Sequence, residues 1–391
     1  MKNHLSGKWN YPTEIHFGAG TLGKLAEHCT MLGIKKPLLV TDSQLSQFDF
    51  FKKLTTSLEN NSLNHEVFDQ VKPNPTGENV AQGVEHLRNY ACDGVVALGG
   101  GSALDAGKAI ALMAHQNLDL FELEDVGDNW KKAKSGLMVP CIAIPTTSGT
   151  GSEVGRASVI LDEKSQVKRI IFHPSMMPEL VIADPELTLG LPAKLTAATG
   201  IDAFVHSFEA FCAPGFHPMA DGIAVEGMRL VWRWLEVAYN EPTNIEARSQ
   251  MLVASSMGAT AFQKGLGAVH ALAHPLGALY DAHHGLLNAI LLPYVIQANI
   301  ALIEDKIQYL CRCFGINECS YNAFLDALLQ WRKSLGIPNS LKDIGINADQ
   351  SARVAKMAVA DPSAGGNPIS FSESDYERIF KAAVEGRIDL L

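Results

Sequence analysis

The residue types that could do chemistry gather in three short segments of the second half of the chain. One segment holds an aspartate and a histidine four positions apart, another holds two histidines with the same spacing, and the third holds two adjacent histidines before a glycine. Because residues four apart lie on one face of an α-helix, each spaced pair can point toward the same space. The six residues are Asp202, His206, His270, His274, His283 and His284.

Apolar residues surround all three segments, so we expect these polar side chains to be buried. A buried imidazole or carboxylate needs a partner, and one shared metal ion would satisfy several of them together. A hydrogen-bonded core histidine is the alternative for any one of these residues taken alone. The two spaced pairs with a third histidine segment favour a metal site. One carboxylate with imidazoles suits Fe, Zn, Ni or Co, and not Ca or Mg.

A run of three glycines in the first half of the chain joins a predicted strand to a predicted helix. The strand ends at Leu98, and Gly99, Gly100 and Gly101 lead into Ser102. Glycines let the backbone approach a pyrophosphate closely, and the N–H groups that open the next helix stabilise the anion. Ser102 could also cap that helix. A tight strand-to-helix connection without any ligand is the alternative.

Two further segments favour a dinucleotide ligand. Asp42 ends an early predicted strand, where a carboxylate can accept hydrogen bonds from the adenosine ribose and repel the 2′-phosphate of NADP. A helix cap is the alternative for Asp42. The polar loop 145–153 follows another predicted strand and offers hydroxyl groups at the carboxyl end of the sheet, where ligands bind in open α/β folds.

The elements around these segments predict two domains. The first half alternates buried strands with helices, which indicates a parallel sheet covered by helices, and residues 157–161 and 167–172 predict a β-hairpin. Beyond Asp184 helical periodicity dominates. We therefore predict a dinucleotide-binding α/β domain over residues 1–185 and a helical metal-binding domain over residues 186–391. The predicted strands are 37–40, 94–98, 140–144 and 180–182, and the first predicted helices are 76–90, 102–114 and 195–212.

Length and composition are those of a globular protein with more than one core. The chain has 391 residues, of which 47% are hydrophobic and 19% charged. A net charge of -10 argues against nucleic acid as a partner. Polar residues interrupt the most apolar stretch, 286–303, and the N-terminus lacks a signal core, so we expect neither a membrane span nor secretion. Seven scattered cysteines fit a reducing cytoplasm better than a disulfide framework.

Taken together, these segments resemble the iron-containing (group III) alcohol dehydrogenase family over nearly the whole chain, from Phe17 to Pro368. The resemblance implies a dehydroquinate synthase-like fold, with an N-terminal Rossmann-like dinucleotide-binding domain and an all-helical C-terminal domain, and with cofactor and metal in the cleft between them. The matching blocks are the glycine turn with Asp105 and Lys108, the 145–153 loop, and residues 183–185, 200–203 and 270–285.

The resemblance also implies roles for particular residues. It favours His284 over the adjacent His283 as a ligand, and it places His274 beside the nicotinamide, which implies catalytic roles for His274 and His284. Lys168 is implied as a cofactor contact, with the adjoining Arg169 as the alternative. The implied metal ligands are Asp202, His206, His270 and His284. The implied cofactor contacts are Asp42, Asn74, Gly99, Gly100, Gly101, Ser102, Asp105, Thr146, Thr147, Lys168 and Leu187.

The prediction is therefore a metal-dependent alcohol dehydrogenase that moves a hydride between an alcohol and NAD, or back to an aldehyde or ketone. Fe²⁺ is the predicted ion, with Zn²⁺ and Ni²⁺ as alternatives, and NAD is predicted over NADP. We expect a small alcohol or aldehyde substrate, a homodimer or larger assembly, and no nucleic acid or membrane partner.

Other functions fit parts of the same pattern. Enzymes of the same fold are one group of alternatives: maleylacetate reductase, dehydroquinate synthase or glycerol dehydrogenase. Maleylacetate reductases work without the metal, which the intact ligand set argues against. A metal-dependent nucleotide-binding or sensor protein that has lost catalysis is the alternative from another class.

Overall fold

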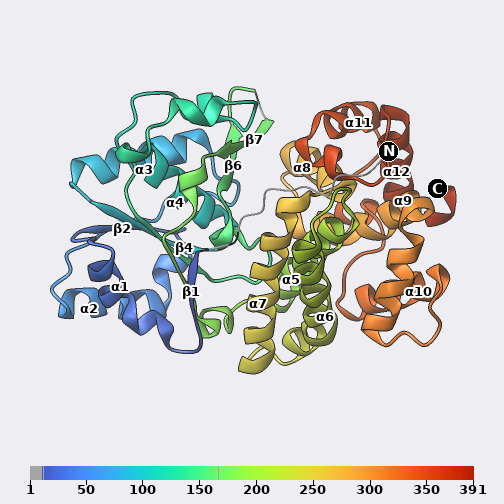
Figure 1. Cartoon of the computed structure of the whole chain (residues 1–391), viewed down its shortest axis with the longest axis horizontal. Coiled ribbons are helices and arrows are strands. Elements are labelled where there is room, and N and C mark those ends of the chain that lie inside the picture. The colour runs from blue at the N-terminus through green and yellow to red at the C-terminus, as the bar shows by residue number, and fades with distance from the viewer. Residues whose placement is uncertain (1–10, 12, 166) are drawn as a thin grey trace. The chain divides into compact units, whose positions relative to one another are not determined.

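The chain folds as two compact units, Pro12–Gly190 and Leu191–Leu391 (Figure 1). The computed structural model describes residue 11, residues 13–165 and residues 167–391. Within them the first unit contains all of the strands, and the second is built from helices. Each unit has its own hydrophobic core.

A six-stranded parallel sheet forms the centre of the first unit. Its strand order is β1-β8-β5-β4-β2-β3, and every neighbouring pair is parallel. All residues of the four inner strands are buried, because helices cover both faces of the sheet. The strands are β1 (Glu14–Phe17), β2 (Pro37–Val40), β3 (Glu66–Phe68), β4 (Gly94–Gly99), β5 (Cys141–Pro145) and β8 (Leu180–Ala183).

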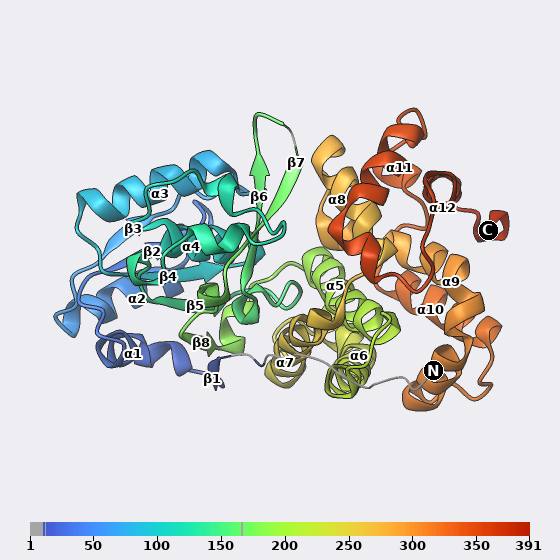
Figure 2. The ribbon, with the colours of Figure 1, turned by 45° about the horizontal axis from the view of Figure 1, so that its top comes forward.

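Two helices cover each face of this sheet (Figure 2). Helices α1 and α2 pack, through side chains such as Leu54, on the face that carries Val96 and Leu98. Helix α4 lies on the opposite face, where Gly107 permits close contact, since a Cβ atom there would lie 2.4 Å from the Cβ of Ala97. Helix α3 packs beside α4. The four helices are α1 (Leu25–Met31), α2 (Asp49–Asn60), α3 (Gly77–Asn89) and α4 (Gly101–Met113).

The predicted α/β architecture and hairpin are confirmed. Strands β6 (Ala157–Asp162) and β7 (Val167–Phe172) form an antiparallel pair beside α4. The sequence prediction missed β1 and β3, the two edge strands. Most of β1 is exposed and β3 has only three residues, so neither has the buried apolar run that revealed the inner strands.

One local prediction was wrong. Ser102 does not cap helix α4, because the helix begins one residue earlier, at Gly101, and its N-cap residue is Gly100. Ser102 therefore lies inside the first turn, where its hydroxyl donates a hydrogen bond to the carbonyl oxygen of Pro73.

The second unit has eight α-helices in the part of the chain that the structure describes. Helix α9 is long and apolar enough to cross a membrane by length and composition, yet 67% of its most apolar window is buried in the structure. The core of this unit draws on α5 to α12. The helices are α5 (Ala193–Cys212), α6 (Pro218–Asn240), α7 (Ile245–Ala261), α8 (Ala268–Tyr280), α9 (His284–Phe314), α10 (Tyr321–Ser334), α11 (Ser351–Ala360) and α12 (Glu373–Glu385).

Candidate metal centre and cofactor site

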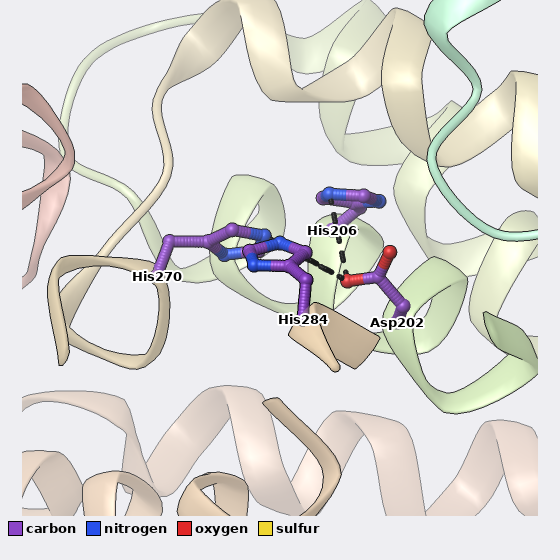
Figure 3. A group of neighbouring side chains, drawn as sticks. All are labelled: Asp202, His206, His270 and His284. Carbon is purple, nitrogen blue, oxygen red and sulfur yellow. Dashed lines mark ion pairs between the residues drawn. The ribbon is translucent and has the colours of Figure 1, made fainter. Parts of the chain in front are cut away.

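The structure brings the four predicted metal ligands together in the helical unit (Figure 3). One possible ligand atom from each residue lies within 4.8 Å of all the others. Oδ1 of Asp202 is the common neighbour of three imidazole nitrogens. It lies 3.8 Å from Nε2 of His206, 3.9 Å from Nε2 of His270 and 3.7 Å from Nε2 of His284.

Three helices position these side chains. Helix α5 presents Asp202 and His206 one turn apart, α8 carries His270 in its first turn, and α9 begins at His284. Gly285 allows the start of α9 to lie against α5, because a Cβ atom there would lie only 2.5 Å from the carbonyl oxygen of Ala198. The glycine after the last histidine therefore permits the close approach that places His284 beside Asp202.

The charge state of the cluster fits a divalent cation. Burial would raise the pKa of Asp202, but the three imidazoles and the Asn288 amide outweigh it and lower the pKa to about 2. Burial, together with the neighbouring His206, lowers the pKa of His270 well below its usual value. At neutral pH the centre therefore offers an ionised carboxylate and a neutral imidazole, which are the forms that bind metal ions. Among the described residues, Asp202 forms ion pairs only with histidines.

Asn288 is a neighbour of the cluster that sequence analysis noticed only as an interruption of an apolar run. Its Nδ2 donates to Oδ1 of Asp202 at 2.6 Å and lies 3.2 Å from Nε2 of both His270 and His284. The side chain is fully buried, and its Oδ1 has no hydrogen-bond partner in the described part of the chain. It follows His284 by four residues on α9, so the same helical spacing that paired Asp202 with His206 could also have indicated Asn288.

Two carboxylates behind the histidines were also missed. Oε2 of Glu209 lies 2.6 Å from Nδ1 of His270, and Oδ2 of Asp361 lies 2.8 Å from Nδ1 of His274. Glu209 lies on α5, seven residues after Asp202, so helical spacing could have found it. Asp361 is 87 residues from His274, and no local spacing indicates their contact.

His274 remains helical although Pro275 follows it, because α8 continues through the proline to Tyr280. The ring of His274 stacks on that of His284, with centroids 5.4 Å apart and an interplanar angle of 12°. It is thus next to the ligand cluster without belonging to the group of four. His283 is placed differently: it is the N-cap residue of α9, and its Nδ1 accepts the N–H of Leu286 at 3.3 Å.

The glycine turn lies in the first unit, at the carboxyl end of β4. After β2 the next strand in the chain, β3, lies on one side of it in the sheet, whereas after β4 the next strand, β5, lies on the opposite side. A topological switch point therefore lies between the neighbouring strands β2 and β4. Open α/β sheets bind ligands at such points. Gly99 has a φ of 152°, and a Cβ atom there would lie 2.6 Å from the Cβ of Ala103. No side chain caps the start of α4, whose N–H groups open this turn.

Several predicted cofactor contacts lie around this edge of the sheet. Asp42 follows β2, and its Oδ1 accepts the N–H groups of Gln44 and Leu45, while its Oδ2 accepts no hydrogen bond in the described part of the chain. The N–H of Thr146 donates to the carbonyl oxygen of Gly99 at 3.0 Å. Thr147 approaches Gly100, where a Cβ atom would lie 3.3 Å from its Cγ2.

The remaining predicted contacts are more dispersed. Nζ of Lys168, on β7, donates to Oδ1 of Asn74 at 2.8 Å, so two predicted residues contact each other. Leu187 lies half-buried in the 3₁₀ turn Pro185–Thr188. Arg169, the alternative to Lys168, is instead paired with two carboxylates of its own unit.

Asp105 has structural partners. Its Oδ1 accepts the hydroxyl of Ser152 at 2.5 Å, its Oδ2 accepts the N–H of Val159 at 2.9 Å, and Nζ of Lys108 lies 3.2 Å away. The first two of these bonds tie α4 to the 3₁₀ turn Ser152–Val154 and to strand β6 of the hairpin.

Comparison with known proteins gives the family. The model of the iron-containing alcohol dehydrogenase family matches residues 12–185, and the C-terminal model of the same family matches residues 196–384. The chain is 37% identical to a 4-hydroxybutyrate dehydrogenase of Cupriavidus necator, over 96% of this chain and 99% of the relative. It is 36% identical to a 1,3-propanediol dehydrogenase of Citrobacter freundii, over 95% of this chain and 97% of the relative.

Solved structures agree with this result. A crystal structure of a 1,3-propanediol oxidoreductase superposes with a TM-score of 0.91 at 34% identity, covering 96% of this chain and all of that one. A sulfoacetaldehyde reductase from Bifidobacterium kashiwanohense in complex with NAD⁺ gives a TM-score of 0.88 at 28% identity, covering 97% of this chain and 99% of that one. The chain therefore belongs to the iron-containing alcohol dehydrogenase family, the metal- and nicotinamide-dependent oxidoreductases that act on alcohols.

Proposed function

We infer that this chain oxidises a small alcohol with NAD, or reduces the corresponding aldehyde or ketone with NADH, at a single divalent ion. The observation that carries this proposal is the buried convergence of one ionised carboxylate and three imidazoles. Fe²⁺ is the ion that the family name favours, and Zn²⁺ and Ni²⁺ suit the same donors. The names of the relatives, which include a 1,3-propanediol dehydrogenase and a sulfoacetaldehyde reductase, point to short alcohols and aldehydes as the substrate class.

The ligand residues would hold the ion, and the glycine turn would hold the cofactor. Bound there, the ion would lower the pKa of an alcohol, and the nicotinamide would supply the hydride acceptor. The ligands we propose are Asp202, His206, His270 and His284. The cofactor contacts we propose are Asp42, Asn74, Gly99, Gly100, Gly101, Ser102, Asp105, Thr146, Thr147, Lys168 and Leu187.

His274 is the residue that we assign to proton transfer. Its Nδ1 is engaged by Asp361, so Nε2 is the ring nitrogen left to receive the hydroxyl proton of the substrate. His274 stacks on His284, which places the acceptor next to the proposed ligand set. We do not count it as a ligand, because four protein ligands must leave a coordination position for substrate.

The direct test is elemental analysis and turnover of the His270→Ala variant. His270 is 1% exposed and is one of the four proposed ligands, so its loss should remove most of the bound metal and the alcohol-dependent reduction of NAD. A screen of short primary alcohols and aldehydes on iron-loaded wild-type protein would identify the substrate. If His270→Ala retains full metal content and activity, the assigned centre is wrong.

A further inference from the structure

Helix α8 carries two histidines one helical turn apart, and each faces a carboxylate from another segment of the chain. Oε2 of Glu209 faces Nδ1 of His270 at 2.6 Å, and Oδ2 of Asp361 faces Nδ1 of His274 at 2.8 Å. In both pairs a carboxylate engages Nδ1, which leaves Nε2 as the nitrogen that can act elsewhere. The chemistry proposed above uses the two histidines and assigns no task to the two carboxylates.

Glu209 is held as a hydrogen-bond acceptor on both of its oxygens. Its Oε1 accepts the N–H of Val269 at 2.7 Å, and its Oε2 accepts the N–H of Gly267 at 2.9 Å in addition to facing His270. Since both oxygens of Glu209 already accept backbone N–H groups, Nδ1 of His270 is the group placed to donate the hydrogen of that pair. The lone pair of this imidazole is then on Nε2, which lies 3.9 Å from Oδ1 of Asp202.

The backbone around Glu209 is shaped for this contact. A Cβ atom on Gly267 would lie 2.9 Å from Oε1 of Glu209 and 3.1 Å from Oδ1 of Asn367. Both separations are shorter than ordinary contacts of a Cβ atom, so a side chain at position 267 would displace the carboxylate. The glycine therefore lets Glu209 reach the first turn of α8 and His270 together.

Charge gives an independent reason to connect Glu209 with the ion. Its side chain is 4% exposed, and the only ion pair it forms in the described part of the chain is with His270. A buried carboxylate without a cationic partner is costly. Burial accordingly raises the pKa of Glu209 to about 7, and the ionised forms of Glu209 and Asp202 together would balance one divalent cation.

We propose that Glu209 and Asp361 are positioning residues with separate tasks. Glu209 holds His270 in the tautomer that presents Nε2 to the ion, and Asp361 holds His274 in the tautomer that receives the substrate proton. Both assignments rest on the proposed function of the two histidines. Carboxylates behind metal-binding histidines commonly fix the ring and its tautomer in this way.

Asn367 provides a control that separates a purely structural role of Glu209 from a positioning role. Asn367 also caps the start of α8, where its Oδ1 accepts the N–H of Ala268 at 3.1 Å, but its hydrogen bonds go to Ala268, Asn299 and Ile369 and not to His270. If Glu209 only stabilised the helix, loss of either cap would have the same consequences. If Glu209 positions His270, only its loss should change metal binding.

The experiment compares Glu209→Gln, Asp361→Asn and Asn367→Ala with the wild-type chain, using Co²⁺ as the probe ion. Its readouts are Co²⁺ affinity by competition with a chelator, the visible spectrum of bound Co²⁺, Tm without metal, and single-turnover reduction of NAD. We expect Glu209→Gln to weaken Co²⁺ binding by about 10- to 100-fold and to alter the spectrum. Asp361→Asn should keep the affinity and spectrum but slow hydride transfer by about tenfold or more. Asn367→Ala should lower the Tm and leave the Co²⁺ affinity, the spectrum and the rate of hydride transfer unchanged.

Each other outcome contradicts a defined part of the proposal. Unchanged Co²⁺ affinity and spectrum in Glu209→Gln would overturn the role of Glu209, and an equal loss in Asn367→Ala would reduce it to a helix cap. If Glu209→Gln does not fold, Gly267→Ala displaces the same carboxylate and should weaken Co²⁺ binding. A wild-type chain that binds no Co²⁺, Fe²⁺ or Zn²⁺ would refute the proposed function itself. If the wild-type chain binds Co²⁺ and every variant binds it with the same affinity, only this inference is refuted.

Discussion

The two units of this molecule build their candidate sites in opposite ways. In the helical unit, four side chains from α5, α8 and α9 converge within 4.8 Å, and all of the possible ligand atoms belong to side chains. In the α/β unit, the glycine turn after β4 offers backbone N–H groups at the start of α4, and its three consecutive glycines contribute no side chains of their own. One site depends on which side chains are present, and the other depends on how closely the backbone can be approached.

The difference teaches where each site is vulnerable. Deleting one imidazole would remove a proposed ligand, whereas the glycine turn has no side chain of its own to delete and would be damaged by adding one. The two sites also lie in separate compact units with separate cores. A change in one site should therefore leave the ligand of the other bound, which the following predictions test.

Among variants that should keep the metal, the largest effect on turnover is expected for His274→Ala. The variant removes the proposed proton acceptor but none of the four proposed ligands, so we expect turnover to fall by about 10² to 10⁴ while metal content stays unchanged. Elemental analysis with steady-state kinetics over a range of pH measures both. Loss of metal as complete as in His270→Ala would show instead that His274 is a ligand.

The next effect is expected for Gly99→Ala, at the other site. The φ of 152° is strained for alanine, and the new Cβ atom would overlap that of Ala103 at 2.6 Å, so the first unit should lose about 1–3 kcal/mol of stability. We expect NADH, titrated by its fluorescence, to bind at least about tenfold more weakly, which corresponds to about 1.4 kcal/mol. Metal content should not change. Wild-type affinity for NADH would place the cofactor away from this turn.

The helical site was predictable from the sequence because a helix converts spacing into direction. Asp202 with His206 predicted a shared face, and the structure places both in the cluster. The buried inner strands were equally predictable, since burial on both faces leaves continuous apolar runs. The edge strands β1 and β3 lack such runs and were missed.

Contacts made by tertiary structure alone could not be predicted. Asp361 meets His274 only because the segment after α11 returns to α8, and nothing in the intervening residues encodes that path locally. The start of α4 shows a finer limit. Ser102 has the side chain of a typical cap, yet the helix begins at the preceding glycine, and the hydroxyl bonds to Pro73 instead. Chain packing decided that position, not local preference.

A smaller effect, on specificity, is expected for Asp42→Gly. The carboxylate follows β2 at the switch point, and Oδ2 is the oxygen not already used by the N–H groups of Gln44 and Leu45. Its removal should lessen repulsion of a 2′-phosphate and raise the ratio of NADP to NAD activity by about tenfold, or about 1.4 kcal/mol. The ratio of kcat/KM for the two cofactors measures it. A wild type that already uses NADP as well as NAD would contradict the role of Asp42.

The smallest effect is expected for His283→Ala, although the adjacent His284 is a proposed ligand. His284 lies in the ligand cluster, whereas the exposed His283 precedes α9 and its Nδ1 accepts the N–H of Leu286 at 3.3 Å. Replacing a capping side chain by alanine costs about 0.5–2 kcal/mol, and this long hydrogen bond belongs at the low end. His283→Ala should therefore lower Tm by about 2 °C and keep all of its metal, whereas His284→Ala should lose the metal. Thermal unfolding with and without a chelator separates the two results, because a chelator lowers the Tm only of a chain that holds the ion. If His283→Ala loses its metal and His284→Ala keeps it, His283 is the ligand of this pair and His284 is not. The close approach of α9 to α5 at Gly285 would then not place a metal ligand beside Asp202.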